Sequence, residues 1–309
     1  MTGQSMLQAE HNKQQPHHSD RGILSIVGTP IGNLSDASPR VIQTLKDADV
    51  VLCEDTRVTA KLMSRFDIHV PLERCDDNVM VSRTQSVLER LYAGQRIAFV
   101  SDAGMPGVSD PGQYLVDAAL DAQLKVEVIP GPSAVICALV ASGFAMDHFF
   151  FEGFLARKAR EQSRRLTALS SIPGALVLYE SPHRVAATLA VIAEVFPQRQ
   201  VALVRELTKV HEEVVRAPAP ELAQCIARRE NLRGECVIVI AQPSAQELSQ
   251  LQAESAGASD APVTLQEALA QGVEAGQTKS ALAKSLSKQF GVPRSEAYDL
   301  IVQYNQNLQ

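Results

Sequence analysis

Residues 101–112 read SDAGMPGVSDPG, a loop that carries two aspartates among three glycines and two prolines. It follows the apolar run 96–100 and precedes a helical pattern at 113–122. A loop of this composition at the carboxyl end of a buried strand is where an open α/β sheet binds its ligand. Glycine lets the backbone approach a ligand closely, and Asp102 and Asp110 can accept hydrogen bonds from hydroxyl or amino groups. The alternative is a connecting turn in which Asp110 and Pro111 only begin the next helix.

Three further loops of this kind follow apolar strand patterns. They read GTPIGN at 28–33, PGPS at 130–133 and ESPHR at 180–184. Each stands before a helical pattern, and each is marked by glycine or proline. Four such junctions predict one cleft lined by several loops.

Alternating strand and helix patterns must position these loops. Over 22–144 they predict an N-terminal α/β domain, a largely parallel sheet with helices on both faces. A second domain is expected over 145–241, with helices at about 157–170, 183–195 and 220–229 between its strands. The Ser-, Ala-, Gln- and Glu-rich stretch 242–262 predicts a flexible linker. Residues 263–305 predict three short helices, of which the last two resemble a helix-turn-helix around Gly291. We expect these helices either to pack or dimerise, or to contact RNA.

Composition limits the function classes. The net charge of −6 means that any contact with nucleic acid must come from a local basic patch. Five cysteines form no CxxC pair, so we expect reduced core residues in a cytoplasmic protein.

No apolar run approaches the length of a membrane span, and the polar residues 1–21 predict a disordered tail rather than a signal peptide. The sequence His211-Glu212-Glu213 lacks metal-ligand spacing, and no metal is expected.

One basic patch stands out between residues 157 and 165. Five positive charges face one negative charge there, on Arg157, Lys158, Arg160, Arg164 and Arg165. In a helix beginning near 157, Arg157, Arg160 and Arg164 would share one face. A solvated surface helix is the alternative. The position of the run just after the strand pattern 149–153, in an acidic chain, favours contact with RNA phosphates.

Taken in order, these motifs resemble those of the tetrapyrrole (corrin/porphyrin) methylase superfamily, in particular its branch that acts on ribosomal RNA. The resemblance covers about residues 22–241 and is carried by VGTPIGNL at 27–34, EDTR at 54–57, the loop 101–112, IPGPSA at 129–134, YESPHR at 179–184, RELTK at 205–209 and RGE at 233–235. It implies two α/β domains with a cofactor cleft between them and a small C-terminal helical module. It also implies a homodimer.

The resemblance further implies S-adenosylmethionine-dependent 2′-O-methylation of a decoding-centre (P-site) cytidine of 16S ribosomal RNA in the small ribosomal subunit. The residues that would bind the cofactor are Gly28, Thr29, Pro30, Asp102, Ala103, Gly104, Met105, Gly107, Ser133 and Ala134. A ribose hydroxyl is a poor nucleophile until its proton leaves, so a base or a basic network should stand nearby. The motifs offer Glu54, Asp55, Arg57, Glu180, His183, Arg184, Arg205, Glu206 and Lys209 for such a base or network. Of these, Glu54, Arg57, Glu180 and His183 are the catalytic candidates.

Two other functions compete with this one. The enzyme could methylate a tetrapyrrole or another small acceptor, although the basic patch and the C-terminal helices speak against that. Alternatively, the chain could be an assembly factor that only binds RNA, although the intact Gly- and Pro-rich loops argue against it. The chain departs from the GxGxxG and GxxxxGK[ST] patterns, so dinucleotide or ATP binding is not expected.

Overall fold

The computed structural model describes residues 22–108, 112–257, 264–275 and 277–307. The chain divides into two compact units, the first ending at Gln242 and the second beginning at Pro243. The tail expected at 1–21, and Asp110 and Pro111 of the loop 101–112, lie outside the described residues. Within the described part of the chain, no helix is long and apolar enough to cross a membrane.

The first sheet is parallel throughout, as the alternating pattern predicts. Its strand order is β3-β2-β4-β1-β5. The strands are β1 (Ile23–Val27), β2 (Val50–Cys53), β3 (Leu72–Arg74), β4 (Arg96–Val100) and β5 (Lys125–Ile129). Strands β1, β2 and β4 are continuous apolar runs because helices cover both faces of the sheet. The carboxyl ends of all five strands therefore lie along one edge.

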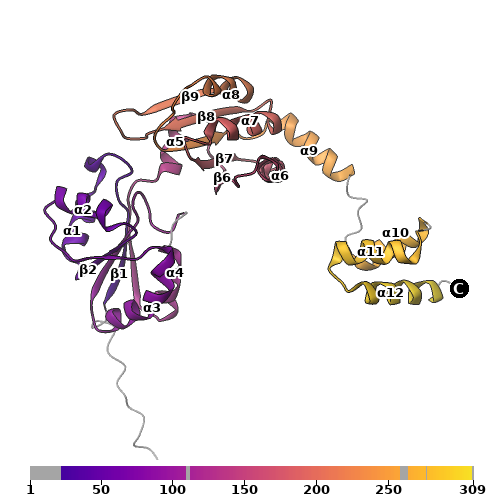
Figure 1. Ribbon diagram of the computed structural model, residues 1–309, viewed down its shortest axis with the longest axis horizontal. Coiled ribbons are helices and arrows are strands. Elements are labelled where there is room, and N and C mark those ends of the chain that lie inside the picture. Colours follow the sequence, from indigo (N-terminus) through magenta and orange to yellow (C-terminus); the bar gives the residue numbers. More distant parts are fainter. Residues whose placement is uncertain (1–21, 109–111, 258–263, 276, 308–309) are drawn as a thin grey trace, which may run out of the picture. The chain divides into compact units, whose positions relative to one another are not determined.

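Helices cover both faces of this sheet (Figure 1). Helices α1 (Pro39–Lys46) and α2 (Thr56–Arg65) pack Leu45 and Met63 on one face, against Val27 and Val51. Helices α3 (Asp77–Tyr92) and α4 (Gly112–Asp121) contribute to a separate core on the other face. Residues that alternate along each strand thus enter two different cores, which fixes the register of the sheet. A short 3₁₀ helix, η1 (Leu34–Asp36), follows the first loop.

The second sheet is mixed, with strand order β6-β7-β10-β8-β9. Strands β6 (Phe149–Phe154) and β7 (Ala175–Glu180) are parallel. Strand β10 (Cys236–Ile240) runs antiparallel to β7 and to β8 (Gln200–Arg205), and β9 (Glu213–Pro218) runs antiparallel to β8. The sequence pattern predicted neither β9 nor β3. Strand β9 lies at the edge of its sheet and has no fully buried residue, and β3 has only three residues.

Helices from both halves of the first unit cover the second sheet. Helices α6 (Ala159–Leu169), α7 (Val185–Val195) and α8 (Ala219–Ala227) share a core with one face. Helix α5 (Ala134–Ser142), which directly follows the loop 130–133, packs on the other face together with Ile31 of the first loop. Thus α5, expected within the domain 22–144, joins that domain to the second sheet.

The structure differs from the linker expected at 242–262. Residues Ala245–Gly257 form a helix, α9. Ser244 is the N-cap of this helix, because its hydroxyl accepts a hydrogen bond from Glu247 N at 3.1 Å. Alanine, glutamine, glutamate and leucine are all favourable in helices, so a composition typical of linkers also suits a helix once its first turn is capped.

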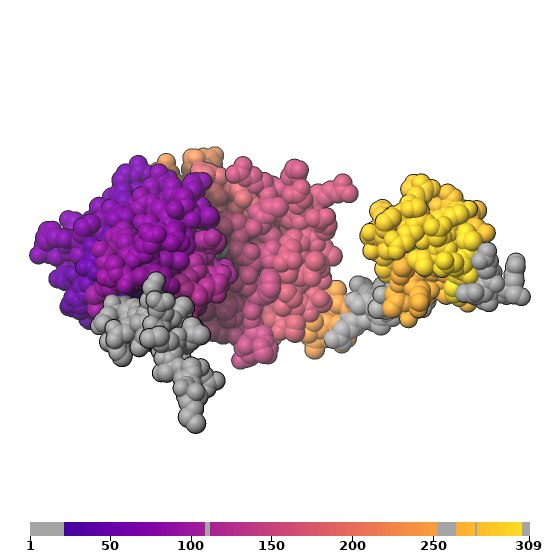
Figure 2. Space-filling model, turned by 90° about the horizontal axis from the view of Figure 1, so that it is seen from below, coloured from indigo at the N-terminus to yellow at the C-terminus, as the bar shows by residue number. Residues whose placement is uncertain are grey.

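The second unit holds the three short helices expected after residue 263. They are α10 (Leu265–Glu274), α11 (Lys279–Phe290) and α12 (Arg294–Asn307). Leu269, Leu286 and Ile301 centre a small core of their own. In Figure 2 the side chains of α10, α11 and α12, at the yellow end of the colour range, form a compact body. Gly291 ends α11 at a φ of +69° and makes the turn into α12.

Candidate active site

The loops after β1 and β4 are joined by their backbones. Thr29 N donates to Gly104 O at 2.8 Å, and Gly104 N donates to Thr29 O at 3.1 Å. The Thr29 hydroxyl adds a bond of 3.4 Å to Ser101 O. Gly104 and Gly107 have φ values of +83° and +89°, which residues with a side chain rarely adopt. This explains why glycine stands at both positions.

The loop after β5 touches the same place. A Cβ on Gly131 would lie 2.6 Å from the carbonyl carbon of Gly28, so the two backbones approach as closely as only glycine allows. The sulfur of Met105 accepts a hydrogen bond from Gly131 N at 3.2 Å. Ser133 and Ala134 follow at the start of α5, both half-buried. Three of the four loops singled out in the sequence therefore meet at one edge of the sheet.

Acidic residues stand at the same edge, at the end of β2. Asp102 N donates to Glu54 Oε1 at 3.2 Å, and Asp55 N donates to Asp102 Oδ1 at 3.1 Å. The Arg57 side chain and backbone donate to Asp55 and hold its pKa at about 2. Partial loss of solvent raises the pKa of Asp102, and the Asp55 carboxylate adds to that increase. A cation placed beside Asp102 would therefore be stabilised.

The fourth loop makes its hydrogen bonds elsewhere. Glu180 is 3% exposed and accepts bonds from Thr188 Oγ1 at 2.6 Å and Ser181 N at 2.8 Å. Arg184 Nε lies 3.3 Å from Glu180 Oε1, and Arg184 also donates to Leu155 O at 2.8 Å. Glu180 thus ties its own loop to the chain that leads into α6. His183 is exposed.

The basic segment 157–165 begins its helix later than expected. Helix α6 starts at Ala159, so Arg157 precedes it and shares no helical face with the other arginines. Arg165 is paired with Glu152 through two bonds of 2.6 Å, and Lys158 Nζ lies 3.4 Å from Glu161. Arg157, Arg160 and Arg164 are exposed. Arg160 and Arg164, four residues apart, form the basic face that remains on the helix.

The segment Arg205–Lys209, which supplies three of the candidates for a base or basic network, also belongs to the site. Asn33 N donates to Thr208 Oγ1 at 3.1 Å, and a Cβ on Gly32 would lie 2.5 Å from Lys209 Cγ. Glu206 and Thr208 have φ values of +52° and +64°. Such strained residues persist where the surroundings hold them, often at functional sites. The RELTK motif was the available signal.

Lys209 holds this segment together. Its Nζ lies 2.8 Å from Glu206 Oε1 and 3.0 Å from Glu235 Oε2. Burial alone would lower the pKa of Lys209, but the hydrogen bonds to these two carboxylates outweigh it and raise the pKa.

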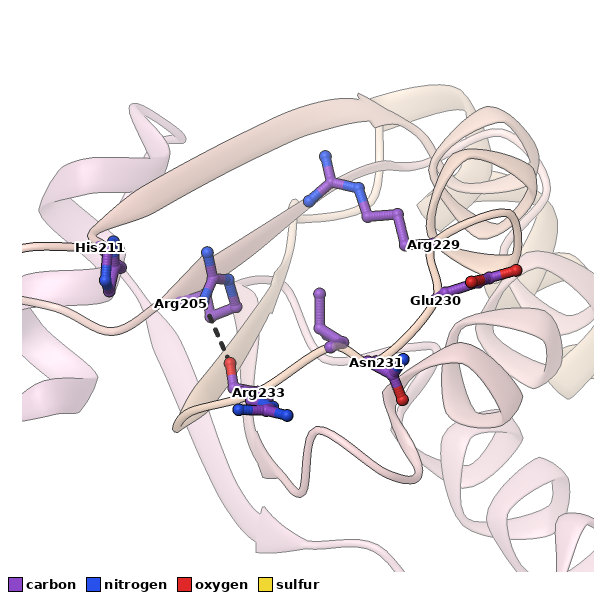
Figure 3. Close-up of a pocket in the computed structure, with 7 residues that line it drawn as sticks. Arg205, His211, Arg229, Glu230, Asn231 and Arg233 are labelled. Atoms are coloured by element: carbon purple, nitrogen blue, oxygen red, sulfur yellow. Dashed lines mark hydrogen bonds between the residues drawn. The ribbon is translucent and has the colours of Figure 1, made fainter.

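A pocket lies beside Arg205, at the start of this segment (Figure 3). Its volume is about 540 Å³, and it is lined by Arg205, His211, Arg229, Glu230, Asn231, Leu232 and Arg233. Glu213, from the HEE sequence, is an ion-pair partner of two of these arginines.

Comparison with known proteins gives a consistent result. The family model described as Tetrapyrrole (Corrin/Porphyrin) Methylases matches residues 24–223. The chain is 40% identical over 280 residues to ribosomal RNA small subunit methyltransferase I of Synechocystis sp., covering 90% of this chain and 97% of that protein. It is 37% identical over 283 residues to the Bacillus subtilis protein of the same name, covering 91% and 94%. Among solved structures, Thermus thermophilus uroporphyrin-III C-methyltransferase complexed with S-adenosyl homocysteine superposes with a TM-score of 0.50 at 18% identity, covering 71% of this chain and 96% of that one.

Proposed function

The chain belongs to the tetrapyrrole (corrin/porphyrin) methylase family, and from that premise we propose that it transfers a methyl group from S-adenosylmethionine to the 2′-hydroxyl of a decoding-centre (P-site) cytidine in 16S ribosomal RNA of the small subunit. The observation that carries the proposal is the near-full-length similarity to ribosomal RNA small subunit methyltransferases I. Action on the ribosomal subunit implies a cytoplasmic site of action.

The three joined loops suit the proposed donor. When bound, S-adenosylmethionine supplies a methyl group on a positively charged sulfonium. The glycines at 28, 104, 107 and 131 let backbone groups come close to a ligand. Asp102, whose pKa is raised, favours a positive charge beside it. We assign donor binding to these loops together with Thr29, Pro30, Ala103, Met105, Ser133 and Ala134.

The acceptor hydroxyl must lose its proton as the new carbon–oxygen bond forms. Glu180 does not suit this role because it is buried and hydrogen-bonded to its own loop. Glu54, at the edge where the three loops meet, and the exposed His183 stay candidates for the base. Arg57 is held by Asp55 and fits an orienting role better than proton transfer.

Within the basic segment 157–165 we assign RNA contact to Arg157, Arg160 and Arg164, because Lys158 and Arg165 are paired with Glu161 and Glu152. Phosphate contacts make binding salt-dependent, with a slope of about −0.7 to −0.9 per contact. The double variant Arg160→Ala/Arg164→Ala should therefore weaken subunit binding and flatten its salt dependence. Arg165→Ala is the matched control, because Arg165 is already neutralised by Glu152. Equal salt slopes for these two variants would refute the assignment.

We also propose that two copies associate through α5 and the edge strand β5. Ile136 and Val140 on α5 are 47% and 61% exposed, and Val128 on β5 is 54% exposed. The opposite side of α5 is packed on the second sheet, so Ile136 and Val140 face outward from that helix. Sedimentation of the wild type and of Val140→Asp tests this, since the variant should be monomeric.

The decisive experiment is methyl transfer from labelled S-adenosylmethionine to purified small subunits from a strain that lacks this gene. Mass spectrometry of nuclease digests would locate the label. We expect 2′-O-methylcytidine from the decoding centre. Donor binding without labelled RNA would favour a small acceptor instead, and RNA binding without donor binding would favour an assembly factor.

A further inference from the structure

The pocket beside the segment Arg205–Lys209 has no role in the proposed methyl transfer. Three of its lining side chains are arginines, at 205, 229 and 233, and His211 adds ring nitrogens at its edge. Glu230 is the only acidic lining residue, and Figure 3 shows its carboxylate pointing away from the guanidinium groups of Arg205 and Arg229. The pocket therefore offers donors and positive charge.

Two of the guanidinium groups are fixed before any ligand arrives. Arg229 Nη1 lies 2.8 Å from both oxygens of Glu213, and Arg205 Nε lies 3.1 Å from Glu213 Oε2. Arg205 Nη1 also donates to Arg233 O at 3.1 Å. Burial alone would raise the pKa of Glu213, but the bonds from Arg229 and Arg205 outweigh it and lower this pKa. One carboxylate holds two cations, so a positive charge is left over, and the side chains lose little entropy when a ligand binds.

Arg233 extends this positive charge to the surface. It is exposed and stands just before Gly234, whose φ of +94° turns the chain beside Glu206. A Cβ at Gly234 would lie 2.4 Å from the Glu206 side chain, so the turn is packed against the strained segment. A guanidinium group on a fixed turn is well suited to bidentate contact with phosphate oxygens.

The same segment connects the pocket to the joined loops. Arg205 lines the pocket, while Thr208 and Lys209, three and four residues later, contact Asn33 and Gly32. A ligand in the pocket would therefore lie one short, rigidly held segment from the proposed donor site. The volume of about 540 Å³ exceeds what a phosphate ion alone needs and is in the range of small-molecule sites, which suits a nucleotide unit.

We propose that this pocket binds a backbone phosphate of the substrate RNA, with its attached nucleotide, close to the residue that is methylated. This inference rests on the proposed function. Arg233 contacts the phosphate oxygens, Arg205 and Arg229 supply the positive floor, and His211 donates from the edge. The bound phosphate fixes the register of the strand, and so it governs which ribose reaches the proposed donor site.

The test compares Arg233→Ala with Arg228→Ala. Both remove one exposed arginine, but Arg228 ends α8 outside the pocket lining. Binding of both variants to unmodified small subunits is measured across a salt series, and methyl transfer is measured in parallel. We expect Arg233→Ala to weaken binding about tenfold and to reduce the salt slope by about 0.7 to 0.9, with donor affinity unchanged. Arg228→Ala should stay within about twofold of wild type.

The outcomes separate this inference from the proposed function. Equal binding by the two variants overturns the phosphate site, even where the wild type methylates RNA normally. If the wild type binds subunits without methylating them, the proposed function fails, while the difference between the variants still decides the pocket. Reduced donor affinity in Arg233→Ala would also overturn the inference, because it would make this residue part of the donor site.

Discussion

Replacing Gly131 with alanine should separate the loops that we propose to bind S-adenosylmethionine. The new Cβ would lie 2.6 Å from the carbonyl carbon of Gly28, 2.7 Å from its Cα and 2.8 Å from its oxygen. All three atoms belong to the backbone, so no side chain can rotate to make room.

The size of the effect follows from this overlap. Ordinary contact begins at 3.4 Å, so the backbones at 28 and 131 must move apart by about 0.8 Å. Overpacking of this kind costs about 1–3 kcal/mol. If the bound state needs the original separation, donor affinity should fall by about fivefold to 160-fold. The free energy of unfolding should fall by the same 1–3 kcal/mol.

Gly174→Ala is the matched control. Its Cβ would lie 2.6 Å from His148 O, an equal overlap with backbone, but in the segment that leads into β7. Both variants should lose similar stability in urea unfolding. Calorimetric titration with S-adenosylmethionine should then show a loss of affinity for Gly131→Ala and wild-type affinity for Gly174→Ala.

Two results would refute this reasoning. Wild-type donor affinity in Gly131→Ala would mean that the contact between residues 28 and 131 is not part of the donor site. Equal loss of affinity in both variants would mean that donor binding responds to overall stability rather than to the spacing of these loops.

Three further perturbations test local parts of the structure. Thr188→Val removes the 2.6 Å donor of Glu180 and should lower the free energy of unfolding by about 1–3 kcal/mol in urea; an unchanged value would mean that the buried carboxylate finds another partner. Arg57→Ala should return the pKa of Asp55 from about 2 towards 3.8 in a nuclear magnetic resonance titration. Because the pKa of Asp55 is lowered in the folded state, its carboxylate stabilises the protein above about pH 3.8, and this contribution disappears as the pH falls towards 2. The free energy of unfolding of Arg57→Ala should therefore fall less steeply than that of the wild type between these pH values. Thr264→Ala breaks the capping box of α10 and should lower the free energy of unfolding of the second unit by about 1 kcal/mol. Hydrogen exchange measures this, and we expect the exchange rates in the sheets of the first unit to stay unchanged. Equally faster exchange in those sheets would contradict independent unfolding of the two units.

The sequence was sufficient where structure depends on local pattern. Buried apolar runs such as 96–100 identify central strands, and glycine and proline mark the loops that follow them. It was insufficient where a neighbour decides the outcome. Strand β9 is held by its pairing with β8, and none of its own residues is fully buried. Helix α9 was hidden by a composition that suits both a linker and a helix.

In the candidate site, too, local pattern identifies the loops, whereas distant neighbours decide how they meet and what their side chains do. Gly28 and Gly131 lie in recognisable loops, but their contact spans more than one hundred residues and is decided only by the register of β1 with β5. Glu180 looked catalytic because it stands in a polar loop at the end of a strand. Its burial depends on Thr188 and Arg184, which approach it only when α7 packs on the second sheet. Motif position therefore located the loop but could not assign the side chain's role.

The strained segment 205–209 contacts both the first loop, through Thr208, and the arginine pocket, through Arg205. Glu206 and Thr208 hold positive φ values, which cost free energy unless neighbouring contacts compensate. Those contacts come from Lys209, Glu235 and the loop at Asn33. The joined loops and the arginine pocket are thus held by one short piece of chain. A ligand in the pocket that tightened this segment would also tighten Gly32 and Asn33, so RNA and donor should bind with positive coupling, each raising the affinity for the other by the same factor.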